Sequence, residues 1–247
     1  MTRTSLGILA FTALGLPAGV LAQQPEPVPA PVVPELHRTV VVERVSGRVL
    51  LKQPSQDSFV TLRGRREVPL GRREVPLGTT VKATEGRVRL IVARNRRGAT
   101  FRAEFFRGQF VVMDSTGSPP LTTLVLAGSS YRKVCGEARA SSRTDGRRVR
   151  RLWGDGKGRF RTRGRYSAAT VRGTRWLTED RCDGTLTRVS RGVVEVEDFT
   201  VVPNAPPVSG EDEGGAPAPP KPQRTPANAP RMIRVGSGES YVARPGG

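Results

Sequence analysis

The chain has 247 residues, and its 41 Lys or Arg against 22 Asp or Glu give a formal net charge of +19, with one His. So much positive charge argues against a protein with an acidic or neutral surface. Apolar residues make up 36% of the chain, less than the roughly 45–50% of an ordinary globular domain, so the sequence predicts a thin core. The 28 Gly and 21 Pro favour short strands joined by many turns and exclude an all-helical protein.

Residues 1–22 have the pattern of a secretory signal peptide. Arg3 supplies the positive start, residues 6–20 the apolar stretch, and residues 20–22 the cleavage site. An uncleaved membrane anchor is the alternative, although the apolar stretch is shorter than the ~20 residues that span a bilayer. We therefore expect an extracytoplasmic protein, secreted or in the cell envelope, with no membrane-spanning segment after cleavage.

Residues 23–38 are rich in proline and show no hydrophobic periodicity, which predicts a disordered tether. Alternating apolar patterns begin at residue 39. The segments 39–45 and 48–53, separated by a Ser46-Gly47 turn, predict the start of a β-meander.

Residues 64–70 and 71–77 form a perfect tandem repeat of the sequence GRREVPL. Because side chains in a strand alternate with a period of two, inserting an odd number of residues would turn every later side chain to the opposite face. We therefore expect the extra copy in a loop or at a sheet edge. Pro69 and Pro76 agree, since proline cannot donate to a central ladder.

Short alternating runs continue after the repeat. In residues 87–93, Val88, Leu90 and Val92 are expected on the core side of a half-buried strand. Further strands are expected between residues 100 and 127.

Cys135 and Cys182 are the only cysteines. In an oxidising compartment two cysteines favour a disulfide over two free thiols. A redox or metal role would need a CxxC pair or clustered His and Cys ligands, which the sequence lacks. The sequence therefore predicts a structural Cys135–Cys182 bridge.

Residues 149–153, a glycine-rich turn at 154–158 and residues 159–166 predict a β-hairpin. In its second arm, four arginines alternate with residues expected to face inward, and we call these four the arginine row. Two interpretations are open: an anion-binding face, because guanidinium pairs bidentately with phosphate and carboxylate, or a solvated outer face whose like charges discourage edge pairing. The row consists of Arg159, Arg161, Arg163 and Arg165, and the inward series of Phe160, Thr162, Gly164 and Tyr166.

No residue pattern predicts catalysis, a metal or a cofactor. His37, the single histidine, lies at the end of the tether, where a general base is not expected. Glu179, Asp180 and Asp183 cluster before Gly184, but an Asp-Gly pair marks a hairpin turn and the spacing of a calcium loop is missing. Glu195 and Glu197 are expected on the solvated side of a strand, so the sequence predicts a protein that is not an enzyme.

Residues 203–230 are rich in Pro, Ala and Gly, and this composition predicts a disordered loop. Residues 231–247 are expected to return to the domain as closing strands and a tail, through the runs 232–235 and 241–243.

The segment from residue 170 to residue 196 resembles the core of FecR-like domains. That family has a VRGT-x-aromatic strand, then a G-T-x-x-x-V strand, then a G-x-V-x-V strand, and residues 233–241 are similar to its last hairpin. Weaker similarity extends over most of residues 39–244. The motif positions in this sequence are Val171, Arg172, Gly173, Thr174, Trp176 and Gly192.

The resemblance implies an all-β extracytoplasmic domain, a short-strand meander, sandwich or roll, over residues 39–202 with closing strands after residue 230. Founding members of the family sense a receptor across the envelope and signal to a sigma factor, but this sequence lacks the cytoplasmic anti-sigma segment and the internal transmembrane helix of that relay. Our first hypothesis is an exported, non-enzymatic binding or scaffold module that contacts envelope polyanions or an envelope protein. The alternative is an anti-sigma-type sensor component acting with a separate membrane partner. Export and the lack of a known nucleic-acid motif argue against nucleic acid as a partner, and the sequence specifies no oligomeric state.

Overall fold

The computed structural model describes residues 32–63, 71–115, 120–136, 146–171, 173–200 and 230–245. The expected signal peptide, the tether up to residue 31, the first copy of the repeat, the late loop up to residue 229 and the motif residue Arg172 lie outside these ranges.

The described part of the chain is almost entirely β, as the sequence predicts. Its fourteen strands belong to one hydrogen-bonded sheet, and its helix, α1 (Tyr131–Cys135), is short. No helix among the described residues is long and apolar enough to cross a membrane. The strands are β1 (Thr39–Lys52), β2 (Val60–Thr61), β3 (Arg72–Pro76), β4 (Thr80–Ala93), β5 (Thr100–Ser115), β6 (Leu121–Leu126), β7 (Arg148–Lys157), β8 (Phe160–Arg163), β9 (Ser167–Val171), β10 (Thr174–Arg181), β11 (Gly184–Arg191), β12 (Val194–Asp198), β13 (Arg231–Val235) and β14 (Ser240–Ala243).

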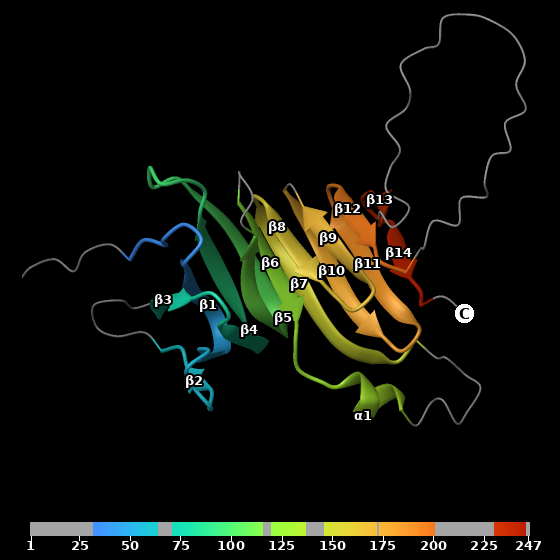
Figure 1. Ribbon diagram of the computed structural model, residues 1–247, viewed down its shortest axis with the longest axis horizontal. Helices are drawn as coiled ribbons and strands as arrows, with labels where there is room; N and C mark the ends of the chain where they lie inside the picture. The colour runs from blue at the N-terminus through green and yellow to red at the C-terminus, as the bar shows by residue number, and fades with distance from the viewer. Residues whose placement is uncertain are drawn as a thin grey trace, which may run out of the picture. The chain divides into compact units, whose positions relative to one another are not determined.

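The long strand β5 organises the sheet (Figure 1). One of its edges pairs with β4, whereas the other pairs with β7 in its first half and with β6 in its second half. From β6 the sheet continues through β8, β9, β12 and β13, and from β7 through β10, β11 and β14. Because a single turn joins β13 to β14, the two branches meet again at their far ends. They form the two layers of a nearly closed sheet, while β1 to β4 extend it on the other side of β5.

Aromatic side chains fill the space between the two branches. The ring of Phe105 on β5 lies 5.6 Å, centroid to centroid, from Phe110 and from Phe160, and 6.0 Å from Trp176. All four side chains are fully buried. The indole Nε1 of Trp176 on β10 donates to Oγ1 of Thr162 on β8 at 2.9 Å, which links one branch to the other.

The expected Ser46-Gly47 turn is absent, because β1 continues through both residues. The register of β1 against β4 shifts between Arg44 and Ser46, which marks a bulge. Gly47 has a φ of +63°, and a Cβ there would lie 2.3 Å from the carbonyl oxygen of Glu85. The prediction was wrong because glycine suits a bulge as well as a turn.

The hairpin expected between residues 149 and 166 is also wrong. β7 pairs with β5 and β10, whereas β8 pairs with β6 and β9, so the two strands lie in different layers. Gly154 and Gly156 belong to β7, where the neighbouring strands leave no room for a side chain. A Cβ on Gly154 would lie 2.4 Å from the indole of Trp176, and one on Gly156 would lie 2.5 Å from the Cα of Ala103.

The second copy of the repeat forms β3, and Val75 within it is buried. Among the described strands β3 pairs with β1 alone, so this copy occupies a sheet edge, in agreement with the expectation from its odd length and its proline. The closing strands β13 and β14 are confirmed as well.

Candidate functional site

Three members of the arginine row lie on the outer side of β8. Phe160 and Thr162 are fully buried, Arg161 is half-buried and Arg163 is exposed. Arg159 lies directly before the strand and is half-buried. The alternation predicted from the sequence is confirmed from Arg159 to Arg163.

Arg165 does not continue the row. β8 ends at Arg163, and a Cβ on Gly164 would lie 2.4 Å from Oδ1 of Asp180. The backbone amide of Arg165 donates to the same oxygen at 2.9 Å, and its guanidinium carbon lies 4.6 Å from the centre of the Tyr131 ring. The expectation of one shared face therefore does not hold for Arg165, because the chain turns towards β10 at Gly164.

The row meets a small acidic strip on β12, where Glu195 and Glu197 face outward as predicted. Nη2 of Arg161 lies 3.3 Å from Oε2 of Glu197. The guanidinium of Arg163 lies over the ring of Phe199, 5.1 Å from its centre. Among the described residues, neither Arg159 nor Arg163 forms an ion pair with a carboxylate.

A pocket of about 410 Å³ opens beside Arg159, and we call it the end pocket. Its walls come from the start of β5, the connection between β7 and β8, and the turn between β9 and β10. Because Arg159 belongs to both, the arginine row continues into the pocket. The described lining residues are Phe101, Lys157, Gly158, Arg159 and Gly173.

A second cluster centres on Asp180, which is fully buried. Its Oδ2 accepts a hydrogen bond from Nε of Arg150 at 3.0 Å and forms an ion pair with Nη2 of Arg150 at 2.8 Å. The hydroxyl of Thr185 donates to Oδ1 at 2.7 Å. The sequence groups Asp180 with the acidic residues of a hairpin turn, but Asp180 lies in β10 and shares the inward parity of Trp176 and Thr178. That period of two could have predicted its burial.

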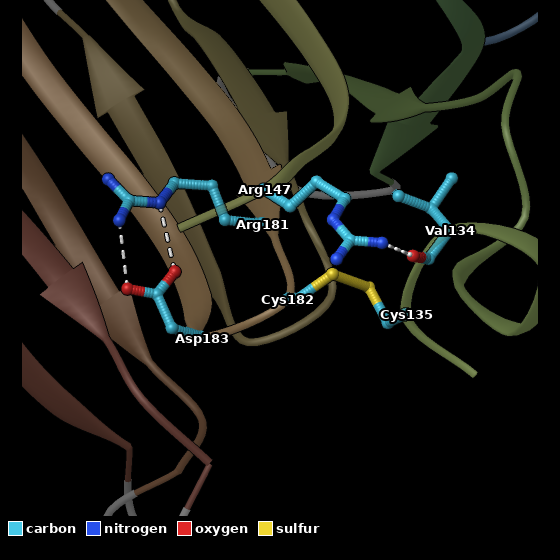
Figure 2. Close-up of a disulfide and its surroundings, with 6 residues drawn as sticks. All are labelled: Val134, Cys135, Arg147, Arg181, Cys182 and Asp183. Carbon is cyan, nitrogen blue, oxygen red and sulfur yellow. Dashed lines mark hydrogen bonds and ion pairs between the residues drawn. A yellow bond between two sulfur atoms is a disulfide. The ribbon is translucent and has the colours of Figure 1, made fainter. Parts of the chain in front are cut away.

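The helix α1 covers this cluster, and the disulfide holds it there. The Cys135–Cys182 bridge is present as predicted and joins α1 to the turn between β10 and β11 (Figure 2). In the same view Arg147 donates to the carbonyl of Val134 at 3.0 Å. A bridge across a loop of this length contributes on the order of 4 kcal/mol in the chain-entropy model.

Tyr131 of α1 is the residue that packs on the Asp180 cluster. Its ring lies edge-on to Tyr166 at 6.2 Å, and the guanidinium of Arg150 lies 5.4 Å from its centre. Burial, with a further contribution from the charge of Asp180, raises the pKa of Tyr131 well above its ordinary value. Its hydroxyl is buried and has no hydrogen-bond partner within the described residues.

Glu179 and Asp183, which the sequence groups with Asp180, have different surroundings. Glu179 is half-buried, one position away from the inward-facing Asp180. Asp183 accepts two hydrogen bonds from Arg181, at 2.9 and 2.8 Å, in the predicted hairpin turn (Figure 2). The described residues contain no group of three potential metal ligands. His37 is exposed just before β1.

The described residues that carry the FecR-like resemblance lie in the core or at tight turns. Val171, Thr174 and Trp176 are buried in β9 and β10. Gly173 and Gly192 have positive φ angles, and a Cβ on Gly192 would lie 2.6 Å from Cγ2 of Thr174. These glycines allow a close turn between β9 and β10, and Gly173 is the described motif residue that lines the end pocket.

Comparisons with protein-family models, with curated proteins and with solved structures find no match for this chain.

Proposed function

We propose that the chain is an exported, non-enzymatic, FecR-like binding module that contacts anionic polymers of the cell envelope through the arginine row and the end pocket. The observation that carries this proposal is the continuity of the two through Arg159. Lys157, Arg159 and Arg163 present positive charge along one path, from the β7–β8 connection to the end of β8.

Few carboxylates neutralise the cations of this path: among the described residues Arg159 and Arg163 form no ion pair, and Arg161 contacts Glu197. The described lining of the end pocket has two cations and no carboxylate. Cations without a local counter-charge attract an anionic chain over distances of about a Debye length, roughly 8 Å at physiological salt. Extended polymers suit such a path because they bring several anionic groups at once.

Export supports a partner outside the cytoplasm. The disulfide is of the kind that forms in secreted and envelope proteins. The signal peptide expected at residues 1–22 agrees, and anionic polysaccharides are abundant in envelopes.

The test compares two variants with the same change in charge. Lys157→Gln/Arg159→Gln removes cations from the end pocket, whereas Arg132→Gln/Lys133→Gln removes two exposed cations from α1. On immobilised heparin, the first variant should bind about tenfold more weakly at low salt, and the slope of log K against log salt should fall by about 2. The α1 variant is the control and should change much less. Equal behaviour of the two variants would show that the protein binds anions only through its net charge, and the proposal would then fail.

A further inference from the structure

The end pocket combines charge with an aromatic surface. Phe101 packs against the core with part of its side chain and lines the pocket with another part. Lys157 and Arg159 flank Gly158 at the β7–β8 connection and line the same pocket. A wall of this kind provides an apolar surface and two cations within a single cavity.

Gly158 lets the β7–β8 connection approach Phe101, and Gly173 leaves space in the pocket. A Cβ on Gly158 would lie 2.8 Å from the Cβ and 3.0 Å from the Cγ of Phe101. Any larger residue would therefore force the turn and Phe101 apart. At Gly173 a Cβ would lie 3.6 Å from Cγ of Lys157, and the φ of +84° there also disfavours a side chain.

Arg94 also contacts the aromatic ring of Phe101. The guanidinium carbon of Arg94, in the β4–β5 turn, lies 5.4 Å from the centre of the Phe101 ring. This cation–π interaction covers part of the Phe101 ring. The ligand favoured here thus carries negative charge and also has an apolar face of limited size.

We propose that the end pocket binds one or two units of an acidic glycan, with the C–H face of a sugar ring on Phe101 and its carboxylate or phosphate group on Lys157 and Arg159. The volume of about 410 Å³ is within the range of roughly 300–1,000 Å³ that small-ligand pockets occupy. A pyranose ring has an apolar C–H face and peripheral polar groups, as this lining requires. Inorganic polyphosphate has no such face and would use the cations alone. This inference rests on the proposed function and assigns a ligand class to the same site.

The experiment uses the full chain and separates the aromatic contribution from the ionic one. The probes are trigalacturonate, its neutral methyl ester, tripolyphosphate and oligothymidylate. Phe101→Leu keeps the apolar packing but removes the ring, Phe101→Tyr keeps the ring, and Phe59→Leu is a control at another partly exposed phenylalanine. Affinities are measured by calorimetry.

We expect Phe101→Leu to weaken trigalacturonate binding by about fivefold or more and tripolyphosphate binding by less than about twofold. Phe59→Leu should bind all probes as the parent does, and Phe101→Tyr should bind trigalacturonate more tightly than Phe101→Leu because it keeps the ring. The neutral ester should bind weakly to every form, because it lacks the anionic group.

Two results would overturn this inference. One is trigalacturonate binding that Phe101→Leu leaves unchanged, and the other is a larger loss for oligothymidylate, which would identify base stacking instead. If Phe101→Leu is unstable, amide chemical shifts of the parent decide: Gly158 and Gly173 should shift with trigalacturonate, and unmoved signals would refute the site. Failure of the broader function is distinguishable, because Lys157→Gln/Arg159→Gln would then leave the binding of every anion unchanged.

Discussion

Two surfaces of the same sheet carry arginines in strands, and they differ in what faces those arginines. On β1, β4 and β5, Arg89 lies between two carboxylates, with Nη1 2.7 Å from Glu43 and Nη2 2.8 Å from Glu104. Arg87 contacts the other oxygen of Glu104 at 2.9 Å. We call these four residues the charge ladder. On β8, by contrast, Arg161 has one carboxylate neighbour, and Arg159 and Arg163 have none among the described residues.

The charge ladder also contacts aromatic side chains on neighbouring strands. The guanidinium of Arg87 lies 4.0 Å from the centre of the Phe106 ring, which is stacked on Trp153 at 6.2 Å. Arg175 lies 5.8 and 5.9 Å from these two rings. Arginines held in this way support the sheet and offer little free charge. The residues on neighbouring strands, more than the number of arginines, therefore decide which surface is cationic.

The largest effect is expected where an arginine forms an ion pair with a fully buried carboxylate. Asp180→Asn should destabilise the fold by roughly 3–5 kcal/mol, because it leaves the charge of Arg150 without its buried partner. Asp155→Asn is the control, since Asp155 pairs with Arg191, whose side chain is 73% exposed, and should cost less than about 1 kcal/mol. Urea denaturation measures both. Similar losses would mean that burial does not separate the two pairs.

An intermediate effect is expected in the charge ladder. Glu104→Gln should cost about 1 kcal/mol at pH 7, because two arginines lose a shared carboxylate at a partly exposed site. Burial raises the pKa of Glu104, but hydrogen bonds from Arg87 and Arg89 outweigh it and hold the pKa below its ordinary value of 4.5.

The sign of the pH dependence follows from that lowered pKa. A carboxyl group with a lowered pKa in the folded state contributes stability above its unfolded pKa and loses it as the pH falls through the folded value. The difference in unfolding free energy between the parent and Glu104→Gln should therefore be full at pH 7 and shrink below about pH 4.5. Denaturation curves at pH 7 and pH 3 test this, and a constant difference would contradict it.

Local patterns predicted which side chains face the core, but they did not predict which strands pair. The period of two assigned Val88, Leu90 and Phe160 to the inside, because alternation is a property of a single strand. Gly154 was taken for a turn, since glycine suits a turn and a close approach equally, and only the distant Trp176 decides between them. The fold class was therefore accessible from the sequence, whereas the layer to which β7 belongs was not.

The candidate site was also predictable only where its residues share one strand. Arg159, Arg161 and Arg163 share one strand, and their common side could be predicted. The end pocket joins Phe101, Arg159 and Gly173, which lie far apart in the chain, so no local pattern indicates it. The burial of Asp180 was predictable from its parity with Trp176, but the acidic residues beside it indicated a hairpin turn.

The smallest effect on stability is expected in the arginine row. Replacing Arg159, Arg161 and Arg163 together by Gln should change the unfolding free energy by less than about 0.5 kcal/mol, since partly exposed charges with few partners contribute little. The 3.3 Å contact of Arg161 with Glu197 and the contact of Arg163 with the Phe199 ring are lost. The replacement also removes like charges from one strand, which offsets part of that loss. Urea denaturation of the triple variant, beside Glu104→Gln as the paired reference, measures the difference. A triple variant less stable than Glu104→Gln would show that the row supports the sheet as the charge ladder does, and its arginines would then not be free to bind an anionic polymer.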